Sequence, residues 1–213
     1  MLSVISCISD WQQYDNFCKP SLLNTSKYLE QLGLEPLQII AINDASSIFE
    51  GYNRGMQQAQ FSIKAFLHQD VDMLAPSWAL KLANAFANHP QCALIGLVGT
   101  QKLGAEGFWW TTGKHYLVGS VFSGEERVDW TFRDIQTFTP VECIDGFFMA
   151  TNRAIPFDET LQGFHLYDMD YSRTIHQRKY SIGVIPHKAW HIGAIRDQDV
   201  EKYFIPYRRK WGL

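Results

Sequence analysis

The sequence predicts an α/β protein whose central sheet is mostly parallel and carries helices on both faces. Along the first hundred residues, short apolar runs that suit buried strands alternate with segments of helical period. Repeated β-α-β alternation is typical of a parallel sheet, because each helix returns the chain to the edge where the previous strand began. From about residue 101 to 140 the helical period fades into Gly, Trp, Thr and Ser, which indicates functional loops or a small antiparallel addition.

The first β-α-β unit is predicted within the first 43 residues. Two apolar runs, LSVISCIS at 2–9 and LQIIAIN at 37–43, have the length and composition of buried strands. The segment 21–34 between them carries leucines at helical spacing, and Gly33 is a suitable stop signal.

The alternation continues to residue 100. A helix is predicted at 48–60, followed by a strand at 63–69 with the sequence IKAFLHQ. Pro76 precedes a helix at 77–89 whose apolar residues form one stripe, and CALIGLVGT at 92–100 is a further buried strand.

The second half of the chain regains its regularity at 141–153, a predicted strand with Asp145 at its centre. A helix is predicted to begin near 168–170, and a strand is predicted at 181–186. The segment YRRKW at 207–211 then places three cations between two aromatic residues.

Length and charge limit the possible functions. With 213 residues and no internal repeat, the chain is expected to form one domain over 1–213. Its formal charge is −3, from 19 basic and 22 acidic residues, so overall charge predicts no binding of nucleic acid.

The cellular compartment is inferred from the pattern of cysteines and from the length of the apolar runs. The four cysteines contain no C-x-x-C pair and two lie in apolar runs, so reduced core thiols are expected. The N-terminus lacks a signal-peptide pattern, and apolar runs fall short of the roughly 18 to 20 residues of a membrane span. These features predict a soluble, cytoplasmic protein whose membrane contact is peripheral at most.

Asp70 and Asp72 follow the strand predicted at 63–69. If the chain stays extended there, both carboxylates point to the same side, about 7 Å apart. Hard oxygen ligands at the carboxyl end of a parallel strand suit Mg²⁺ or Mn²⁺, with substrate phosphates supplying further ligands. The alternative is that Asp72 only leads into the turn before Pro76, and His68 is interpreted as a structural residue.

Asp145 and Gly146 interrupt the apolar strand predicted at 141–153. A buried acid without a partner costs several kcal/mol, so Asp145 is expected to reach a site. Gly146 would allow a substrate to approach the backbone closely.

Five pieces of sequence, taken in order, resemble family-2-like glycosyltransferases with the GT-A fold. They run from about residue 5 to 191 and read ISD, INDASS, YNRG, HQDVD, and DGFFMATNR with FDE, GFHLYDMD and WH. The resemblance implies a Rossmann-like GT-A sandwich. It also implies a nucleotide-binding half over about 1–100 and an acceptor and catalytic half over about 101–213.

The resemblance implies a site for a nucleotide-sugar donor, such as a UDP- or GDP-sugar. The implied donor-binding residues are Ser9, Asp10, Asp44, Ser46, Asn53, Arg54 and Asp70. A divalent cation, Mn²⁺ or Mg²⁺, would be bound by Asp72, Asp70 and His191. Its role would be to offset the charge of the departing nucleoside diphosphate.

Transfer to an acceptor hydroxyl also needs a carboxylate base. Side chains at i and i+2 of a helix diverge by about 200 degrees, so only one of Asp168 and Asp170 can be the base. The family usually carries Glu-Asp at this site, which favours Asp168, although Tyr167 stands where the Glu is expected. The alternative for both acids is a helix N-terminal role.

A carbohydrate or glycoconjugate acceptor is implied. By the resemblance Asp145 would contact the donor sugar or the acceptor, while Trp109 and Trp110 either stack on an acceptor sugar or act as apolar anchors. The 207–211 segment would close over the diphosphate or contact anionic lipid.

The predicted function is therefore metal-dependent, inverting glycosyl transfer, with two alternatives. A nucleotidyltransferase also combines an α/β sheet with acidic ligands, but the first strand here is followed by ISDWQQYDNF instead of a Gly-rich phosphate loop. A non-catalytic sugar- or nucleotide-binding module of the same fold is compatible with Tyr167.

Overall fold

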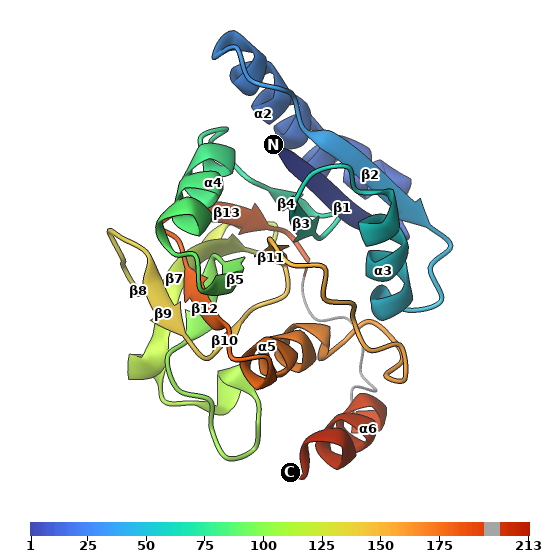
Figure 1. Ribbon diagram of the computed structural model, residues 1–213, viewed down its shortest axis with the longest axis vertical. Coiled ribbons are helices and arrows are strands. Elements are labelled where there is room, and N and C mark those ends of the chain that lie inside the picture. The colour runs from blue at the N-terminus through green and yellow to red at the C-terminus, as the bar shows by residue number, and fades with distance from the viewer. Residues whose placement is uncertain (194–200) are drawn as a thin grey trace.

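A computed structural model describes residues 1–193 and 201–213, and its larger sheet has seven strands. Their order is β2-β1-β3-β11-β5-β12-β9 (Figure 1). The strands are β1 (Leu2–Ile8), β2 (Gln38–Asn43), β3 (Ile63–Leu67), β5 (Cys92–Gly96), β9 (Thr139–Val141), β11 (Phe148–Thr151) and β12 (Ser181–Val184).

The larger sheet is mixed, so the expectation of a mostly parallel sheet is wrong in this respect. The pairs β1-β2, β1-β3 and β5-β12 are parallel, whereas β11 is antiparallel to both β3 and β5, and β9 is antiparallel to β12. The predicted strand at 141–153 is in fact broken into β9, β10 (Cys143–Ile144) and β11 around a turn at 145–147. An apolar run indicates burial, but it does not indicate the direction in which the chain inserts between two strands.

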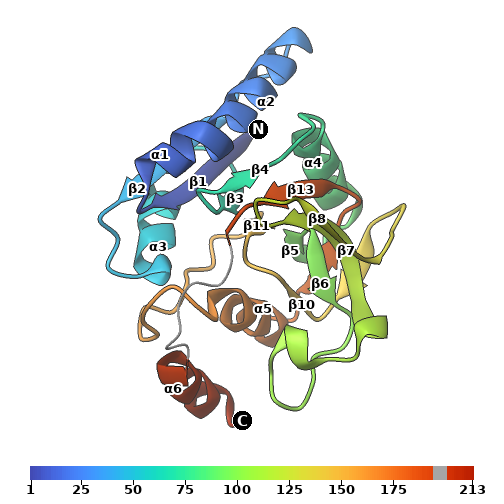
Figure 2. The same ribbon diagram turned by 180° about the vertical axis from the view of Figure 1, so that it is seen from behind.

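A smaller sheet crosses beside the first, in the order β10-β6-β7-β13-β4, with β8 paired to β7 (Figure 2). Its other strands are β4 (Val71–Asp72), β6 (Val98–Thr100), β7 (Leu117–Ser123), β8 (Val128–Arg133) and β13 (Lys188–His191). The run predicted as one strand at 92–100 passes from β5 in the larger sheet to β6 in the smaller one. The predicted antiparallel addition is present as the β7-β8 hairpin within this second sheet.

Helices cover both faces of the larger sheet, as predicted. They are α1 (Trp11–Gln13), α2 (Lys19–Gln31), α3 (Ile48–Gln58), α4 (Trp78–Asn88), α5 (Tyr167–Gln177) and α6 (Glu201–Trp211), with a π-helical turn η1 (Tyr14–Cys18) and 3-10 turns η2 (Trp109–Thr111) and η3 (Lys114–Tyr116). Successive side chains of β1 point to opposite faces of the larger sheet and pack against different helices. Val4 belongs to a core cluster that includes Trp78 of α4, and its neighbour Ile5 belongs to a second cluster with Phe49 of α3 and Tyr171 of α5.

Within the described ranges, none of the helices is long and apolar enough to cross a membrane.

Candidate active site

The polar centre of the molecule forms where the two sheets meet. Strand β3 ends at Leu67, and the backbone N–H of His68 donates to the carbonyl of Phe147 in the 145–147 turn at 3.1 Å. Strand β4 then pairs antiparallel with β13, which places His191 opposite Val71. The N–H of Ile192 donates to the carbonyl of Asp70 at 3.1 Å. Segments 79 to 122 residues apart in the chain are thus held together by backbone hydrogen bonds.

Three side chains converge at this point: His68, Asp70 and His191. Their possible ligand atoms all lie within 4.8 Å of one another. Nδ1 of His68 is 3.3 Å from Nε2 of His191, which is 3.4 Å from Oδ1 of Asp70. Two imidazole nitrogens and one carboxylate oxygen form a donor set that suits divalent transition metals.

The ionisation states of two of these groups also suit a cation. Burial, reinforced by the neighbouring His191, lowers the pKa of His68 to about 4, so this imidazole is neutral at pH 7. Burial acts to raise the pKa of Asp70, but the hydrogen bond with His191 and the nearby imidazoles outweigh it and lower this pKa to about 2. A neutral imidazole and an ionised carboxylate are the forms that bind metal.

Gly193 lies directly against the carboxylate of Asp70. A Cβ at this position would overlap Oδ2 of Asp70, so only glycine allows the backbone to pass so close to the carboxylate. The donor set, its ionisation and this close backbone approach together fit a bound divalent cation.

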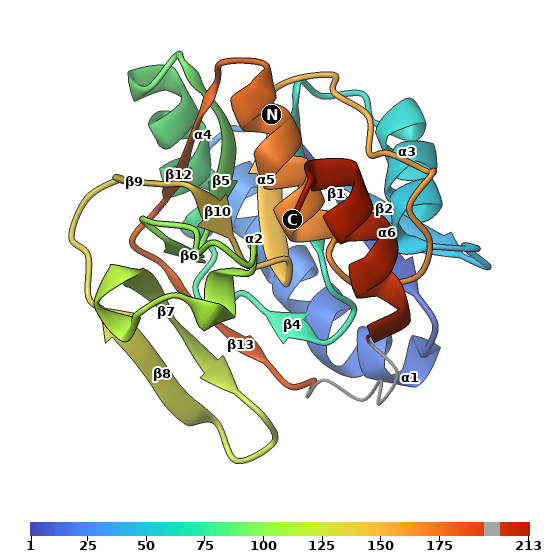
Figure 3. The same cartoon turned by 90° about the horizontal axis from the view of Figure 1, so that it is seen from below.

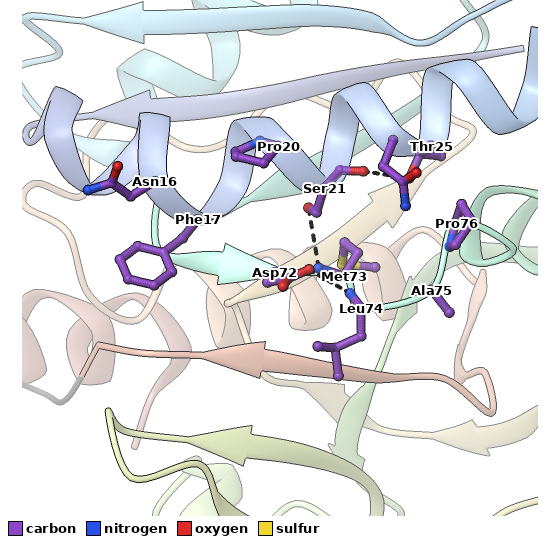
Figure 4. Close-up of a pocket in the computed structure, with 11 residues that line it drawn as sticks. Asn16, Phe17, Pro20, Ser21, Thr25, Asp72, Met73, Leu74, Ala75 and Pro76 are labelled. Carbon is purple, nitrogen blue, oxygen red and sulfur yellow. Dashed lines mark hydrogen bonds between the residues drawn. The ribbon is translucent and has the colours of Figure 1, made fainter.

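Asp72 does not join this group. The expected extended geometry from Asp70 to Asp72 is wrong, because the chain turns at Gln69 and Asp70 before β4 begins. Oδ1 of Asp72 accepts from the N–H of Leu74 at 2.7 Å, which is the turn chemistry considered as an alternative. Its side chain lines a separate cavity of about 240 Å³ between α2 and the 72–76 segment (Figure 4).

Two carboxyl groups, the half-buried Asp145 and the buried Asp168, lie next to each other at the 145–147 turn. Oδ2 of Asp168 accepts from the N–H of Gly146 at 3.1 Å, and Oδ1 accepts from the N–H of Met169 at 2.9 Å. Burial and the negative charge of Asp145 raise the pKa of Asp168 to about 7. Burial also raises the pKa of Asp145, against the opposing effect of His191. A carboxyl group with a pKa near neutrality is suited to proton transfer at physiological pH.

The carboxylate of Asp170 points away from that of Asp168, as the helical geometry predicts. Its carboxylate binds Nζ of Lys210 at 2.7 Å and accepts from Nε1 of Trp211 at 2.8 Å, so it anchors α6 to α5 (Figure 3). Lys210 also contacts Asp158 at 2.7 Å. The 207–211 segment is therefore part of a helix packed on α5 and binds two carboxylates.

Three of the predicted donor residues lie at the ends of β1 and β2, namely Ser9, Asp10 and Asp44. The N–H groups of Ser9 and Asp10 both donate to Oε1 of Gln69, at 2.8 and 3.0 Å, which ties the end of β1 to the turn that carries Asp70. Asp44, at the end of β2, forms an ion pair with Arg54 at 3.1 Å.

Two more of the predicted donor residues make contacts within the fold. The N–H of Ser46 donates to Glu50 at 3.2 Å. The side-chain amide of Asn53 donates to the carbonyl of Phe157 at 3.0 Å and accepts from its N–H at 2.8 Å. Asn53 therefore holds the 157–159 segment against α3.

The two tryptophans of the predicted acceptor region differ in exposure. Trp109 packs against a small apolar cluster with Tyr207, whereas Trp110 is 46% exposed and stacks on Phe108. Gly146 has no room for a side chain, because a Cβ there would collide with the hydroxyl of Tyr167.

Sequence reasoning missed His68, Gln69 and Tyr167 as parts of this centre. His68 lies two residues before Asp70, and that H-x-D spacing was the available signal. Tyr167 hydrogen-bonds to Nε2 of His68 from 99 residues away, a contact that has no signal in the local sequence.

The fold of this chain is similar to that of several solved GT-A glycosyltransferases. The crystal structure of GalNAc-T7 with UDP, GalNAc and Mn²⁺ is similar over 98% of this chain and 48% of that chain, with a TM-score of 0.63 and 11% identity. The mannosyltransferase PcManGT from Pyrobaculum calidifontis, in complex with GDP-Man and Mn²⁺, is similar over 99% of this chain and 63% of that chain, with a TM-score of 0.52 and 12% identity. S. aureus TarS 1-349 is similar over 90% and 60%, with a TM-score of 0.55 and 11% identity.

These likenesses concern the fold, and the chain spans about half the length of GalNAc-T7. No curated protein matches the chain by sequence. Residues 3–210 match the family described as "Glycosyltransferase like family". Because this match covers nearly the whole chain, the protein belongs to that family, and the resemblance seen in its ordered motifs is confirmed.

Proposed function

We propose that the protein is a metal-dependent glycosyltransferase that moves a sugar from a nucleotide-diphosphate donor to an acceptor hydroxyl with inversion. The observation that carries this proposal is the convergence of His68, Asp70 and His191 at the centre that also holds the carboxyl groups of Asp145 and Asp168. Family membership and the UDP-, GDP-Man- and Mn²⁺-containing structures of similar fold support it.

His68, Asp70 and His191 are the residues that would hold the cation, with His68 assigned here in place of Asp72. A divalent cation bound there would offset the negative charge that develops on the leaving nucleoside diphosphate. The low pKa of Asp70 keeps its carboxylate ionised throughout the physiological range, so the site remains anionic.

Asp168 is assigned as the base. The acceptor oxygen forms a bond to the anomeric carbon as the bond to the diphosphate breaks, and Asp168 takes the proton of the acceptor hydroxyl. Its two backbone N–H partners orient the carboxylate, and the neighbouring Asp145 raises its proton affinity. A single base opposite the leaving group implies inversion, which NMR assignment of the product anomer tests.

The donor nucleoside is placed at the ends of β1 and β2, in the half formed by residues 1–100. Ser9, Asp10 and Asp44 lie there, with Arg54 held beside Asp44. The acceptor, a carbohydrate or glycoconjugate, is assigned to the half formed by 101–213, where the exposed ring of Trp110 can stack on a sugar.

Thermal stabilisation by nucleoside diphosphates tests this proposal. UDP, GDP, CDP and dTDP are each added with and without Mn²⁺, and we expect UDP or GDP to stabilise the protein only when Mn²⁺ is present. At about 100 times Kd the stabilisation is about 2.7 kcal/mol, or roughly 5–10 °C in melting temperature. A response to none of the four would contradict the proposal, and binding without turnover of any sugar nucleotide would indicate a non-catalytic module.

Transfer is also expected to depend on pH through Asp168. Its pKa in the folded protein is about 7, above the ordinary value of 3.8, and the base must be ionised, so kcat should fall as the pH is lowered through about 7. Because the pKa of Asp168 is raised in the folded protein, protonation of this residue stabilises the fold. This contribution is fully present below the unfolded-state pKa of Asp168 and is lost as the pH rises through about 7. His68 and His187, whose pKa values are lowered to about 4 by burial, change stability in the opposite sense below pH 6.5. The test is therefore a kcat profile between pH 5 and 8, in which kcat should rise with pH.

A further inference from the structure

Tyr167 contacts the ring nitrogen of His68 that faces away from the other possible ligands. Nδ1 of His68 lies 3.3 Å from Nε2 of His191, on the side of the proposed cation site. Nε2, on the opposite edge of the ring, is hydrogen-bonded to the hydroxyl of Tyr167. The two nitrogens of this imidazole therefore have separate partners.

We propose that Tyr167 is a positioning residue that fixes the tautomer and orientation of His68 for cation binding, an inference that rests on the proposed function above. A neutral imidazole has one N–H and one nitrogen with a free lone pair. For Nδ1 to offer its lone pair to a cation, the proton must be on Nε2, and Nε2–H then donates to the hydroxyl oxygen of Tyr167. In this arrangement the Tyr167 hydroxyl acts as the acceptor and keeps its own proton.

The Tyr167 ring is itself held in place by its surroundings. It is 4% exposed and packs edge-on against Phe49 and Tyr52, with ring centroids 6.4 and 5.7 Å away. Gly146 lies against the hydroxyl and leaves no space for a Cβ. A hydroxyl held this tightly presents one fixed acceptor to His68, which lowers the cost of orienting the ring when a cation binds.

The matched variants Tyr167→Phe and Tyr171→Phe test this inference. Tyr171 is one turn further along α5 and is also buried, but its hydroxyl donates to the carbonyl of Ile155 at 2.8 Å. Removing a hydrogen-bond partner of a metal ligand typically lowers metal affinity about 10- to 100-fold. We therefore expect Tyr167→Phe to weaken Mn²⁺ binding by about this factor and Tyr171→Phe to leave Mn²⁺ binding unchanged. Calorimetry with Mn²⁺ alone measures this difference, and melting curves establish that both variants fold.

A second readout reports the tautomer directly. Imidazole ¹⁵N shifts of the cation-free protein at pH 7.5 should show His68 protonated at Nε2 in the wild type and as a tautomer mixture in Tyr167→Phe. Should Tyr167→Phe fail to fold, Gly146→Ala, which displaces the Tyr167 hydroxyl, should give the same loss of Mn²⁺ affinity. Equal affinities of wild type and Tyr167→Phe, or an unchanged tautomer, would overturn this inference alone. A wild-type protein that binds no Mn²⁺ would overturn the proposed cation site as well.

Discussion

Replacing Asp168 with Asn is expected to lower kcat for sugar transfer by about 10²- to 10⁴-fold, the usual contribution of a general base. The change keeps the size and shape of the side chain but removes its ability to accept a proton. Asp168 is 7% exposed, and its carboxylate accepts two backbone N–H groups, so its position is fixed by the 145–147 turn and the start of α5. The affinity for the donor should change little, because the assigned donor residues lie at the other half of the site.

Asp170→Asn is the comparison for this experiment. The two carboxylates are two residues apart, but Asp170 is bound by Lys210 and Trp211 and points toward α6. We expect its replacement to lower the melting temperature and to leave kcat largely unchanged. Steady-state kinetics with a fixed donor and a melting curve for each variant separate the two effects. If Asp170→Asn lost as much kcat as Asp168→Asn while remaining folded, the assignment of the base would be wrong.

Replacing Asp70 with Asn is expected to weaken Mn²⁺ binding by at least about 100-fold, more than is typical for loss of a partner of a ligand. Asp70 supplies the negative charge of the group formed by His68, Asp70 and His191. The low pKa of Asp70 keeps its carboxylate ionised. Transfer should fall with it, because the diphosphate would depart without charge compensation.

Asp72→Asn is expected to bind Mn²⁺ as the wild type does. An Asn at this position keeps the oxygen that accepts from the N–H of Leu74, so the turn should remain intact. Calorimetry with Mn²⁺ on both variants decides between the two neighbouring acids. The opposite result, with Asp72→Asn losing the cation and Asp70→Asn keeping it, would restore the assignment of Asp72 that the sequence motif implied.

Much of the fold was predictable from the sequence. The helices at α2, α3, α4 and α5 and the strands β1, β2 and β12 follow from the periods of their apolar residues, and the ordered motifs indicated the family. The mixed order of the larger sheet was not predictable, because β11 inserts between β3 and β5 through pairings across more than 50 residues. Local sequence reports burial, whereas strand direction depends on how distant segments pair.

By itself, the sequence determined which chemical groups end the strands: the acids at 70, 72 and 145, the acids that open α5, and the histidine at 191. The tertiary structure decided which of them meet. The turn at Gln69 and Asp70 breaks the alternation that would have aligned Asp70 with Asp72, and the β4-β13 pairing brings His191 to His68 and Asp70. Helical geometry predicted that Asp168 and Asp170 diverge, but only packing placed Asp168 beside Asp145 and gave Asp170 to α6. The physical reason is that a metal or proton-transfer site requires atoms within a few ångströms, and such distances between remote residues are set by tertiary contacts.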